Sequence, residues 1–547
     1  MKIIKQISSL EKARANFVPD FEEIFSKTCL KGERFSYQIA VKSDDILNGI
    51  IEVDSLLKDN IKVYTVLNAV MDKPVTENVA SNDINYITKE PGLMPDILKP
   101  IEENNNIFMA WTNTSSLWVE VNIPEDIGAG IYTIEVKYKE IETGELIFCK
   151  KMEINVCDKK ILPQNLIYSR WLYVDCIADY HGVEVYSDEH WKLIEAYISQ
   201  AVDVGINMIL VPVHTPPLDT AIGTTRTCVQ LVDIEKKGDE YIFDFTKFKK
   251  YINICKKCGV KYYEIAHLFS QWGAKCAPNI MVTENGIKDY MFGWHVASDS
   301  DEYILFLKQY IAAISGELSE EGISEYTYFH ISDEPTLENI ETYKRASEII
   351  RPLIGKSQTI DAISEYAFYE NGLVQCPVTG IDHIKPFLEH DIKNQWAYYC
   401  CFPQSAYTNS FLAMPLARVR ILGVLLYKYN IKGFLHWGLN YYNGQVSRYH
   451  INPYVTTSAD GRFPSGDPFI LYPSKDGAYG CIRGKVIFEA IEDMKICETL
   501  EPYIGREAVV KMIDDEAGMD VNFDNYPVDK TYLMRLREKM TDAIARF

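Results

Sequence analysis

Strand-like apolar runs alternate with amphipathic helical segments from residue 162 to about residue 500. The order begins with LIYSRWLYVD, the helical DEHWKLIEAYISQAVDVG and the apolar INMILVPVHT, and it repeats as far as the helical GKVIFEAIEDMKICETLE. Such alternation predicts a parallel sheet with crossover helices, and the count is close to eight units, as in a TIM-type (β/α)8 barrel with insertions. Two units near residues 361–385 are short and weakly patterned, so a doubly wound sheet is the alternative.

A different pattern precedes this region. From Phe35 to about Lys160, short strands and turn residues recur without long helical periodicity, which predicts an antiparallel β-sandwich. The polar stretch CDKKILPQN is the expected linker. A chain of 547 residues is too long for one typical core. We therefore expect a β-sandwich at 1–161, a catalytic barrel at 162–500 and a helical segment at 501–547 that packs on the barrel.

Charge and composition exclude several classes of partner. With 56 basic and 77 acidic residues the net charge is −21, and no basic run interrupts it, so neither a nucleic acid nor an anionic membrane is an expected partner. The N-terminal residues lack the apolar core of a signal peptide, and no segment approaches the ~20 apolar residues of a membrane span. The 13 scattered cysteines suit reduced thiols, so a cytoplasmic location is expected. The oligomeric state is left open.

The sequence contains few of the motifs that mark metal or cofactor chemistry. Cys255 and Cys258 form a CxxC that could join His267 and Cys276 in a zinc site. No second CxxC follows, so a helix end closed by Gly259 is the preferred interpretation. Gly-rich phosphate loops, HExxH and GxSxG are also missing from the sequence. We expect neither a metal nor an organic cofactor, and a metal-dependent barrel hydrolase stays as an alternative.

Polar and aromatic residues recur at the expected carboxyl ends of the strands. In a barrel these ends meet on one face, where the βα loops build the active site. Any one of these residues alone is more often structural, but their repetition suits a sugar, whose ring stacks on aromatic faces while its hydroxyls need fixed polar partners. The candidate sugar-binding residues are Asp175, His214, His267, Trp272, Asp361, Tyr398, Trp437, Asn440 and Tyr441.

Two adjacent carboxylates, Asp333 and Glu334, end the strand-like stretch YTYFHISDEP. Neighbouring carboxylates repel each other and are costly to bury. A capping role for the following helix would explain them, since acids favour the first turn. At an arbitrary strand-to-helix junction capping is the preferred interpretation, and a catalytic role needs support from the rest of the chain.

Four blocks of the sequence resemble glycoside hydrolase family 123, which comprises β-N-acetylgalactosaminidases. They are HISDEP, RVRILGVLLYKYNIKGFLHWGLNYYN, GDPFILYP and IRGKVIFEAIEDMK. The resemblance covers roughly Leu162 to Leu500, and the N-terminal region matches the family's accessory β-sandwich more loosely. The long loop TSADGRFPSGDPF departs from the family pattern, so the rim that selects the sugar is expected to differ.

The resemblance implies a retaining exo-glycosidase that acts on glycans with terminal β-linked N-acetylgalactosamine. Glu334 would be the general acid/base, and Asp333 would position the 2-acetamido group, whose oxygen attacks the anomeric carbon. In this scheme Asp333 is expected to be anionic and Glu334 protonated. Another β-hexosaminidase or β-glycosidase of the same fold, or a non-catalytic carbohydrate-binding barrel, is the alternative.

Overall fold

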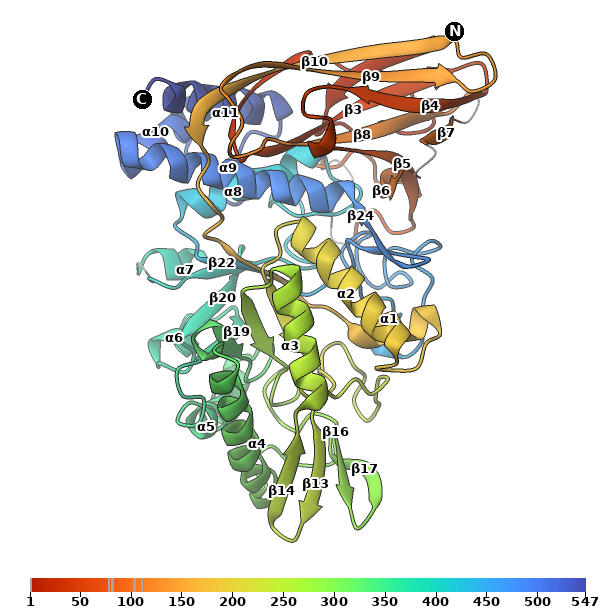
Figure 1. Cartoon of the computed structure of the whole chain (residues 1–547). Coiled ribbons are helices and arrows are strands. Elements are labelled where there is room, and N and C mark those ends of the chain that lie inside the picture. Colours follow the sequence, from red (N-terminus) through yellow and green to blue (C-terminus); the bar gives the residue numbers. More distant parts are fainter. Residues whose placement is uncertain (1, 77–78, 80–82, 102–104, 110–111, 391) are drawn as a thin grey trace.

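The computed structural model describes residues 2–76, 79, 83–101, 105–109, 112–390 and 392–547. Its elements form three tiers (Figure 1). Antiparallel sheets of the N-terminal region lie at one end, a barrel fills the middle, and a small four-stranded sheet projects at the other end. Long helices from the C-terminal third lie between the N-terminal sheets and the barrel.

Eight parallel strands close a barrel, because β11 pairs with β12 on one side and with β22 on the other. This closure confirms the (β/α)8 prediction and excludes the doubly wound sheet. The strands, in order around the barrel, are β11 (Ile167–Arg170), β12 (Met208–Val211), β15 (Tyr262–Ile265), β18 (Thr327–Phe329), β19 (Gln358–Ile363), β20 (Cys376–Gly380), β21 (Trp396–Tyr398) and β22 (Gly433–His436).

Helices of very different length connect the strands. The two weakly patterned units near 361–385 contain α6 and α7, each a single turn of four residues, so they have no helical periodicity to detect. The helices are α1 (Val174–His181), α2 (Asp188–Asp203), α3 (Thr246–Cys258), α4 (Asp301–Glu320), α5 (Ile340–Ile350), α6 (Ala367–Glu370), α7 (Lys385–Leu388), α8 (Leu416–Lys428), α9 (Ile482–Ile504), α10 (Arg506–Ala517) and α11 (Lys530–Ala545). Gly259 closes α3 in the left-handed conformation, as expected for a helix end.

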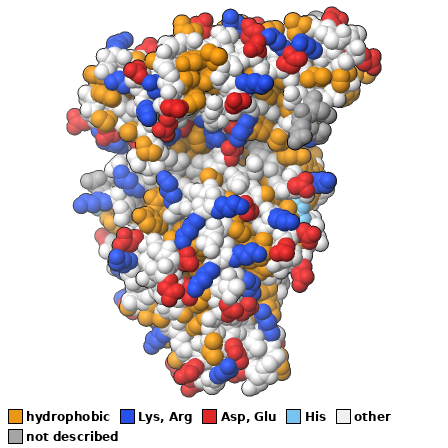
Figure 2. Space-filling model, in the orientation of Figure 1, with side chains coloured by type: hydrophobic (Ala, Val, Ile, Leu, Met, Phe, Trp, Pro, Cys, Tyr) orange, Lys and Arg blue, Asp and Glu red, His pale blue; other side chains and the backbone are white. Residues whose placement is uncertain are grey.

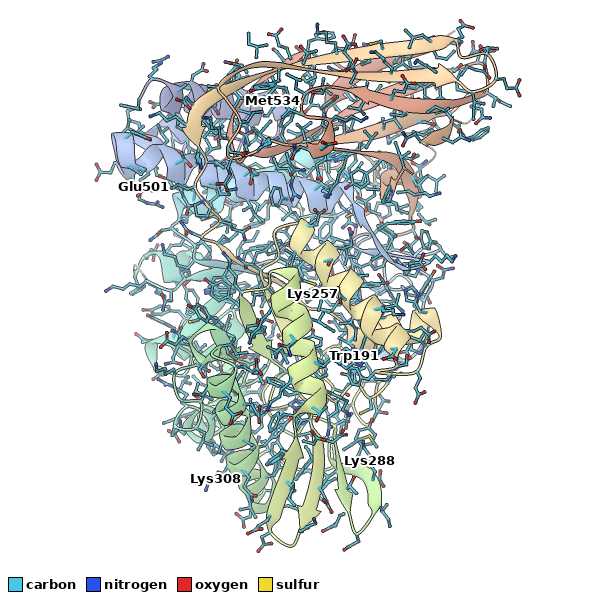
Figure 3. The ribbon with its side chains drawn as sticks, in the orientation of Figure 1. Trp191, Lys257, Lys288, Lys308, Glu501 and Met534 are labelled. Atoms are coloured by element: carbon cyan, nitrogen blue, oxygen red, sulfur yellow. The ribbon has the colours of Figure 1, made fainter. Side chains whose placement is uncertain are left out.

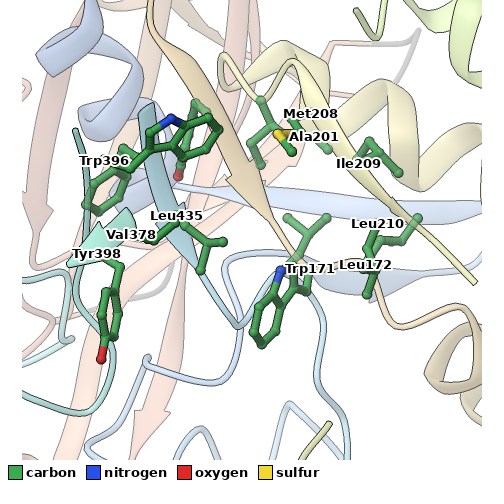
Figure 4. Close-up of a cluster of buried hydrophobic side chains, with 14 of the residues drawn as sticks. Trp171, Leu172, Ala201, Met208, Ile209, Leu210, Val378, Trp396, Tyr398 and Leu435 are labelled. Atoms are coloured by element: carbon green, nitrogen blue, oxygen red, sulfur yellow. The ribbon is translucent and has the colours of Figure 1, made fainter. Parts of the chain in front are cut away.

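Packing around the barrel is tight. A Cβ atom on Gly433 of β22 would lie 2.0 Å from the Trp396 ring, and one on Gly423 of α8 would lie 1.7 Å from the carbonyl oxygen of Ala490. Only glycine permits these approaches. In the core, Val378, Trp396 and Leu435 lie close together, while the hydroxyl of Tyr398 points away from them (Figure 4).

The N-terminal region forms the predicted β-sandwich, from two sheets that pack face to face around a shared apolar core. One strand pair departs from the antiparallel pattern, since β2 runs parallel to β10. The strands are β1 (Lys2–Ser8), β2 (Ser26–Lys31), β3 (Arg34–Ser43), β4 (Leu47–Asp54), β5 (Ile61–Met71), β6 (Gly92–Pro100), β7 (Asn106–Met109), β8 (Thr114–Asn122), β9 (Gly130–Glu140) and β10 (Leu146–Lys160).

The structure does not divide cleanly at residue 161, where the sequence placed the domain boundary. Strands β23 (Tyr472–Ser474) and β24 (Gly477–Cys481) come after the barrel strands, yet β24 pairs with β6 and extends the seven-stranded N-terminal sheet. A fully buried ion pair follows at once, with Arg483 Nη2 2.9 Å from Asp96 Oδ2. The sandwich and the barrel therefore share a sheet and a buried polar contact.

The C-terminal helices lie against α9, which is buried along most of its length. Both α10 and α11 contact α9, and α11 also contacts β2 and β10 of the sandwich. Arg537 of α11 bonds Glu33 in the sandwich at 2.5 Å and also bonds Asp493 of α9. The segment 501–547 thus bridges the two domains.

A small sheet projects from the barrel on the loops that follow β12 and β15. It contains β13 (Asp233–Lys237), β14 (Glu240–Asp244), β16 (Ile280–Glu284) and β17 (Ile287–Phe292). Lys288 lies on this projecting sheet, and Lys308 on the neighbouring α4 (Figure 3). Basic and acidic side chains are mixed over the visible face of the whole molecule (Figure 2). Among the described helices, none has the length and apolarity to cross a membrane.

Candidate active site

The acidic pair lies at the carboxyl end of β18, on the face where the βα loops meet. Glu334 adopts a left-handed backbone conformation with φ of +42° and is followed by Pro335. A non-glycine residue in this region costs about 1–2 kcal/mol. The turn brings two consecutive side chains to the same side, because both Asp333 and Glu334 line one cavity.

This cavity has a volume of about 260 Å³. Residues that follow seven of the eight barrel strands, or that lie at their ends, line it, and the long loop after β22 completes the wall. The lining residues are Trp171, Tyr173, Leu218, Asp219, Gln271, Trp272, Asp333, Glu334, Ala362, Tyr398, Cys400, Cys401, Leu435, Trp437, Val446, Arg462 and Phe463.

Asp333 is the more buried member of the pair and has 8% of its surface exposed. Its carboxylate accepts one hydrogen bond from Gln271 Nε2 at 3.3 Å. Burial and the neighbouring Glu334 raise the pKa of Asp333 to about 8. Without a ligand, burial therefore favours the protonated form of Asp333. The expectation that Asp333 is anionic applies to the site with a sugar bound and stays a prediction.

Glu334 is more exposed to solvent than Asp333, and the hydrogen bond that it accepts is shorter. Its Oε1 accepts a hydrogen bond from the Tyr398 hydroxyl at 2.7 Å. Burial and the charge of Glu334 raise the pKa of Tyr398 well above its usual range, so the hydroxyl keeps its proton and stays a donor. The pair thus combines a buried carboxyl that holds a proton with a partly exposed carboxylate whose orientation is set by a tyrosine.

Aromatic side chains form another part of the cavity wall. The Trp437 indole donates a hydrogen bond from Nε1 to Asp467 Oδ2 at 3.0 Å, which holds the ring from behind. Its centroid lies 5.1 Å from the Tyr441 ring and 4.9 Å from the Phe463 ring. Burial raises the pKa of Asp467 to about 7. Trp437 is thus fixed in place while its partly exposed surface lines the cavity.

Two regions of the sequence match descriptions of one protein family. Residues 171–500 match the family description "Glycoside hydrolase 123, catalytic domain", and residues 13–140 match "Glycoside hydrolase 123 N-terminal domain". The chain belongs to glycoside hydrolase family 123. The resemblance noted in the sequence is thereby confirmed, and so is the assignment as a glycosidase.

One solved structure agrees with this family 123 fold over the whole chain. A family 123 glycoside hydrolase from Clostridium perfringens, described under "the details of glycolipid glycan hydrolysis", is 14% identical, covers 100% of this chain and 98% of its own, and superposes with a TM-score of 0.71. A GH10 xylanase from Thermobacillus composti covers 60% of this chain at 11% identity, with a TM-score of only 0.31. No curated protein matches the sequence.

Five of the eleven site residues predicted from the sequence line the cavity of this family 123 protein, namely Asp333, Glu334, Trp272, Tyr398 and Trp437. The other six lie behind the lining: Asp175, His214, His267, Asp361, Asn440 and Tyr441. Their roles in sugar contact were predicted from strand-end position alone. Position along a strand does not tell whether a side chain reaches the cavity or fills the space below it.

Two of these six residues hold lining residues in place, and a third acts through Arg226, whose guanidinium lies 5.0 Å from the centroid of the Tyr173 ring. Asn440 binds both backbone groups of Tyr173, with distances of 2.9 and 3.0 Å. The Tyr441 hydroxyl lies 3.5 Å from the Asp219 carbonyl oxygen. Asp175 forms a buried ion pair with Arg226 at 3.1 Å. These contacts support the wall of the cavity.

The remaining three belong to a polar cluster below the pair. Asp361 was expected at a strand end but lies inside β19, two residues before Ile363, and it accepts hydrogen bonds from the amides of Ile331 and Ser332. His330 Nδ1 lies 3.1 Å from Asp361 Oδ1. His214 bonds the carbonyl oxygen of His267 at 2.9 Å. The cluster thus anchors the segment that carries Asp333.

His267, His330 and Asp361 lie close enough together to be considered as metal ligands. The two imidazoles are stacked, with centroids 4.1 Å apart and planes 16° apart, so their lone pairs lie in nearly parallel planes, which is unfavourable for binding one ion. Burial opposes a charge on His330, but hydrogen bonds to Asp361 and Glu264 raise its pKa to about 9. His330 is thus a charged partner of both carboxylates. The expectation that no metal is needed stays a prediction.

Several lining residues were not singled out from the sequence. Gln271 stands next to the predicted Trp272, and Arg462 and Phe463 lie in the long loop expected to form the rim. Asp219 follows His214 after two prolines, beyond the assumed strand end. Its Oδ2 is buried and has no hydrogen-bond partner within the described part of the chain. A third carboxylate, next to the Tyr441 side chain, therefore belongs to the cavity wall.

Proposed function

We propose that this family 123 protein is a retaining exo-glycosidase that releases terminal β-linked N-acetylgalactosamine, with the substrate's own 2-acetamido oxygen as the nucleophile. The observation that carries the proposal is the pair of adjacent carboxylates in one small cavity, with contrasting environments at Asp333 and Glu334. Paired acids whose environments separate their proton affinities are the usual basis of acid/base roles in glycosidases.

The two carboxylates exchange roles when substrate binds. An acetamido N–H that donates to Asp333 favours its ionised form, so the shared proton moves to Glu334. Glu334 then donates it to the leaving oxygen, and Tyr398 keeps the carboxyl oriented through Oε1. The anionic Asp333 stabilises the positive charge that develops on the oxazolinium. Water, activated by Glu334, opens this intermediate with net retention.

Cavity size supports cleavage at a chain end. At about 260 Å³ the cavity falls just below the range of about 300–1,000 Å³ for drug-sized ligands, which suits one sugar residue better than an internal segment of a glycan. The Clostridium perfringens relative is described as acting on glycolipid glycans. A glycan or glycoconjugate with an exposed terminal residue is accordingly the proposed substrate.

Substrate comparison tests the mechanism. With β-GalNAc, β-GlcNAc and β-Gal chromogenic glycosides at equal concentration, we expect turnover only where a 2-acetamido group is present, because that group supplies the nucleophile. Initial rates measure this directly. Comparable rates on β-galactosides would exclude the substrate-assisted route and would favour Asp219 as an enzymic nucleophile, since its carboxylate lies in the same cavity.

Trp437→Ala is expected to lower kcat/KM by about 10²-fold, because it removes both the stacking surface and the shape of the sugar subsite. Trp437→Phe keeps an aromatic face but loses the bond to Asp467, and it should lose less. Steady-state kinetics and the Tm of each variant separate the two effects. Full activity in a less stable Trp437→Ala protein would make Trp437 a core residue and not a sugar platform.

A further inference from the structure

Cys400 and Cys401 are the only adjacent cysteines in the sequence, and both line the catalytic cavity. Each is partly exposed. Their sulfur atoms lie 4.0 Å apart, within hydrogen-bond distance for sulfur. The proposed hydrolysis uses neither thiol. A contacting pair of accessible thiols in an active-site wall therefore calls for its own explanation.

We propose that Cys400 and Cys401 form a reversible modification site, which a low-molecular-weight disulfide oxidises to an intramolecular Cys400–Cys401 disulfide that lowers the activity of the adjacent catalytic pair. The chemical part of this inference is independent of the reaction catalysed. The effect on activity rests on the proposed glycosidase function.

The oxidation is a two-step thiol–disulfide exchange. Cys401 loses its proton to solvent, and its thiolate attacks one sulfur of the small disulfide RSSR, which forms a mixed disulfide and expels RS⁻. The Cys400 sulfur, after losing its own proton, attacks the Cys401 sulfur and expels the second RS⁻. Each RS⁻ takes up a proton. The pair thus loses two electrons, and RSSR is reduced to two RSH.

The environment of Cys400 indicates which thiol reacts first. The hydrogen bond with Cys401, burial, and the charges of Cys401 and Glu334 raise the pKa of Cys400 well above its usual range. Because the thiolate is the reactive form, Cys400 is a poor attacking group towards an external disulfide. It suits the second step, in which its target is the neighbouring sulfur.

Local geometry makes the product both reducible and disruptive. Consecutive Cα atoms are 3.8 Å apart across a trans peptide bond, whereas disulfides usually span about 4.4–6.8 Å, so a bond between neighbours is strained and easily reduced. In the dithiol form Asn409 holds the Cys400 carbonyl oxygen, and Gln404 holds that of Cys401, each at 2.9 Å. Closing the ring has to disturb these bonds.

The disturbance lies close to the catalytic pair. Cys400 follows Tyr398 by two residues, and the Tyr398 hydroxyl orients Glu334 at 2.7 Å. Small displacements of a positioned catalytic group can cost up to about 10²-fold in rate. Oxidation is therefore expected to reduce kcat by about tenfold or more, and reduction should restore it.

The test uses the full-length protein and oxidised glutathione as the probe. Peptide mass analysis under non-reducing conditions should show that the peptide containing residues 400 and 401 has lost two hydrogens, and dithiothreitol should reverse this. The ratio of oxidised to reduced kcat is measured in parallel. An N-acetylgalactosamine-saturated sample should oxidise more slowly, since the sugar would cover the cavity wall.

Three cysteine-to-serine variants show which thiol is responsible for the loss of activity on oxidation. Cys401→Ser removes the attacking thiol, so its oxidised-to-reduced ratio of kcat should be close to one, whatever its basal rate. Cys400→Ser should stop at the mixed disulfide and serves as the second variant if Cys401→Ser does not fold. Cys149 is an exposed thiol on β10 of the sandwich. The Cys149→Ser variant should therefore respond to oxidation as wild type does.

Three outcomes would overturn the inference. The first is no loss of two hydrogens in the 400–401 peptide of the wild type. The second is a complete disulfide there with unchanged kcat. The third is a Cys401→Ser protein as sensitive as wild type, which would assign the response to another thiol such as Cys276. Because the peptide mass does not depend on hydrolysis, failure of the proposed glycosidase reaction is distinguishable from failure of the dithiol chemistry.

Discussion

Glu334→Gln is expected to slow hydrolysis of substrates with poor leaving groups by about 10²–10⁴-fold, because it removes the proton donor while keeping the size of the side chain. An activated aryl glycoside needs little protonation of its leaving group, so its first step should lose much less. Measuring kcat/KM across aryl leaving groups of decreasing acidity displays this as a steeper dependence in the variant than in wild type.

Two further measurements sharpen this prediction. Azide should partly rescue Glu334→Ala on activated substrates, because it attacks the intermediate without general-base assistance, and it should leave Asp333→Ala unrescued. Glu338→Gln, an exposed carboxylate four residues along the same segment, is the matched control and should stay within about twofold of wild type. Equal fractional losses of Glu334→Gln on all leaving groups would contradict an acid/base role.

Asp333→Asn is expected to lose activity and to become more stable relative to wild type as the pH rises. The variant lacks the charge proposed to hold the acetamido group, so good and poor leaving groups should suffer alike. Folding raises the pKa of Asp333 from its ordinary value of 3.8 to about 8. The folded wild type therefore binds more protons than the unfolded chain between these values, and its free energy of unfolding falls as pH rises through that window.

Asparagine cannot ionise, so the free energy of unfolding of the Asp333→Asn variant does not fall in this way as the pH rises. The stability difference between Asp333→Asn and wild type should grow by at most about 1.4 kcal/mol per pH unit, or up to about 4 kcal/mol between pH 5 and 8. Paired Tm measurements across this range test it. Asp361→Asn is the opposing control, since it leaves the His330 imidazolium without its closest carboxylate and should destabilise the fold. A pH-independent difference for Asp333→Asn would show that Asp333 ionises freely.

Local sequence patterns were sufficient for the architecture. The barrel was predictable because apolar periodicity is a property of consecutive residues, and α2 or α4 displays its buried face within a few turns. The HISDEP block was predictable for a related reason, since two carboxylates directly after an apolar strand are conspicuous in any context. The single-turn α6 and α7 left two units weakly defined, because four residues cannot display a helical period.

Tertiary structure alone decided which strand-end residues reach the cavity. Asp361 and Asp219 illustrate both errors, since one was expected at the site and lies buried against His330, while the other was passed over and lines the cavity. The entry of β24 into the N-terminal sheet was equally invisible, because its partner β6 is about 380 residues away in sequence.

The sequence by itself thus determined the barrel, the sandwich and the position of the acidic pair, because these depend on near neighbours along the chain. Tertiary structure decided the proton on Asp333, the hydrogen bond from Tyr398 to Glu334, and the exposure of Cys400 and Cys401 to the cavity. The physical reason is that desolvation and hydrogen bonding depend on every group within a few ångströms, and in this site those groups come from seven different strands.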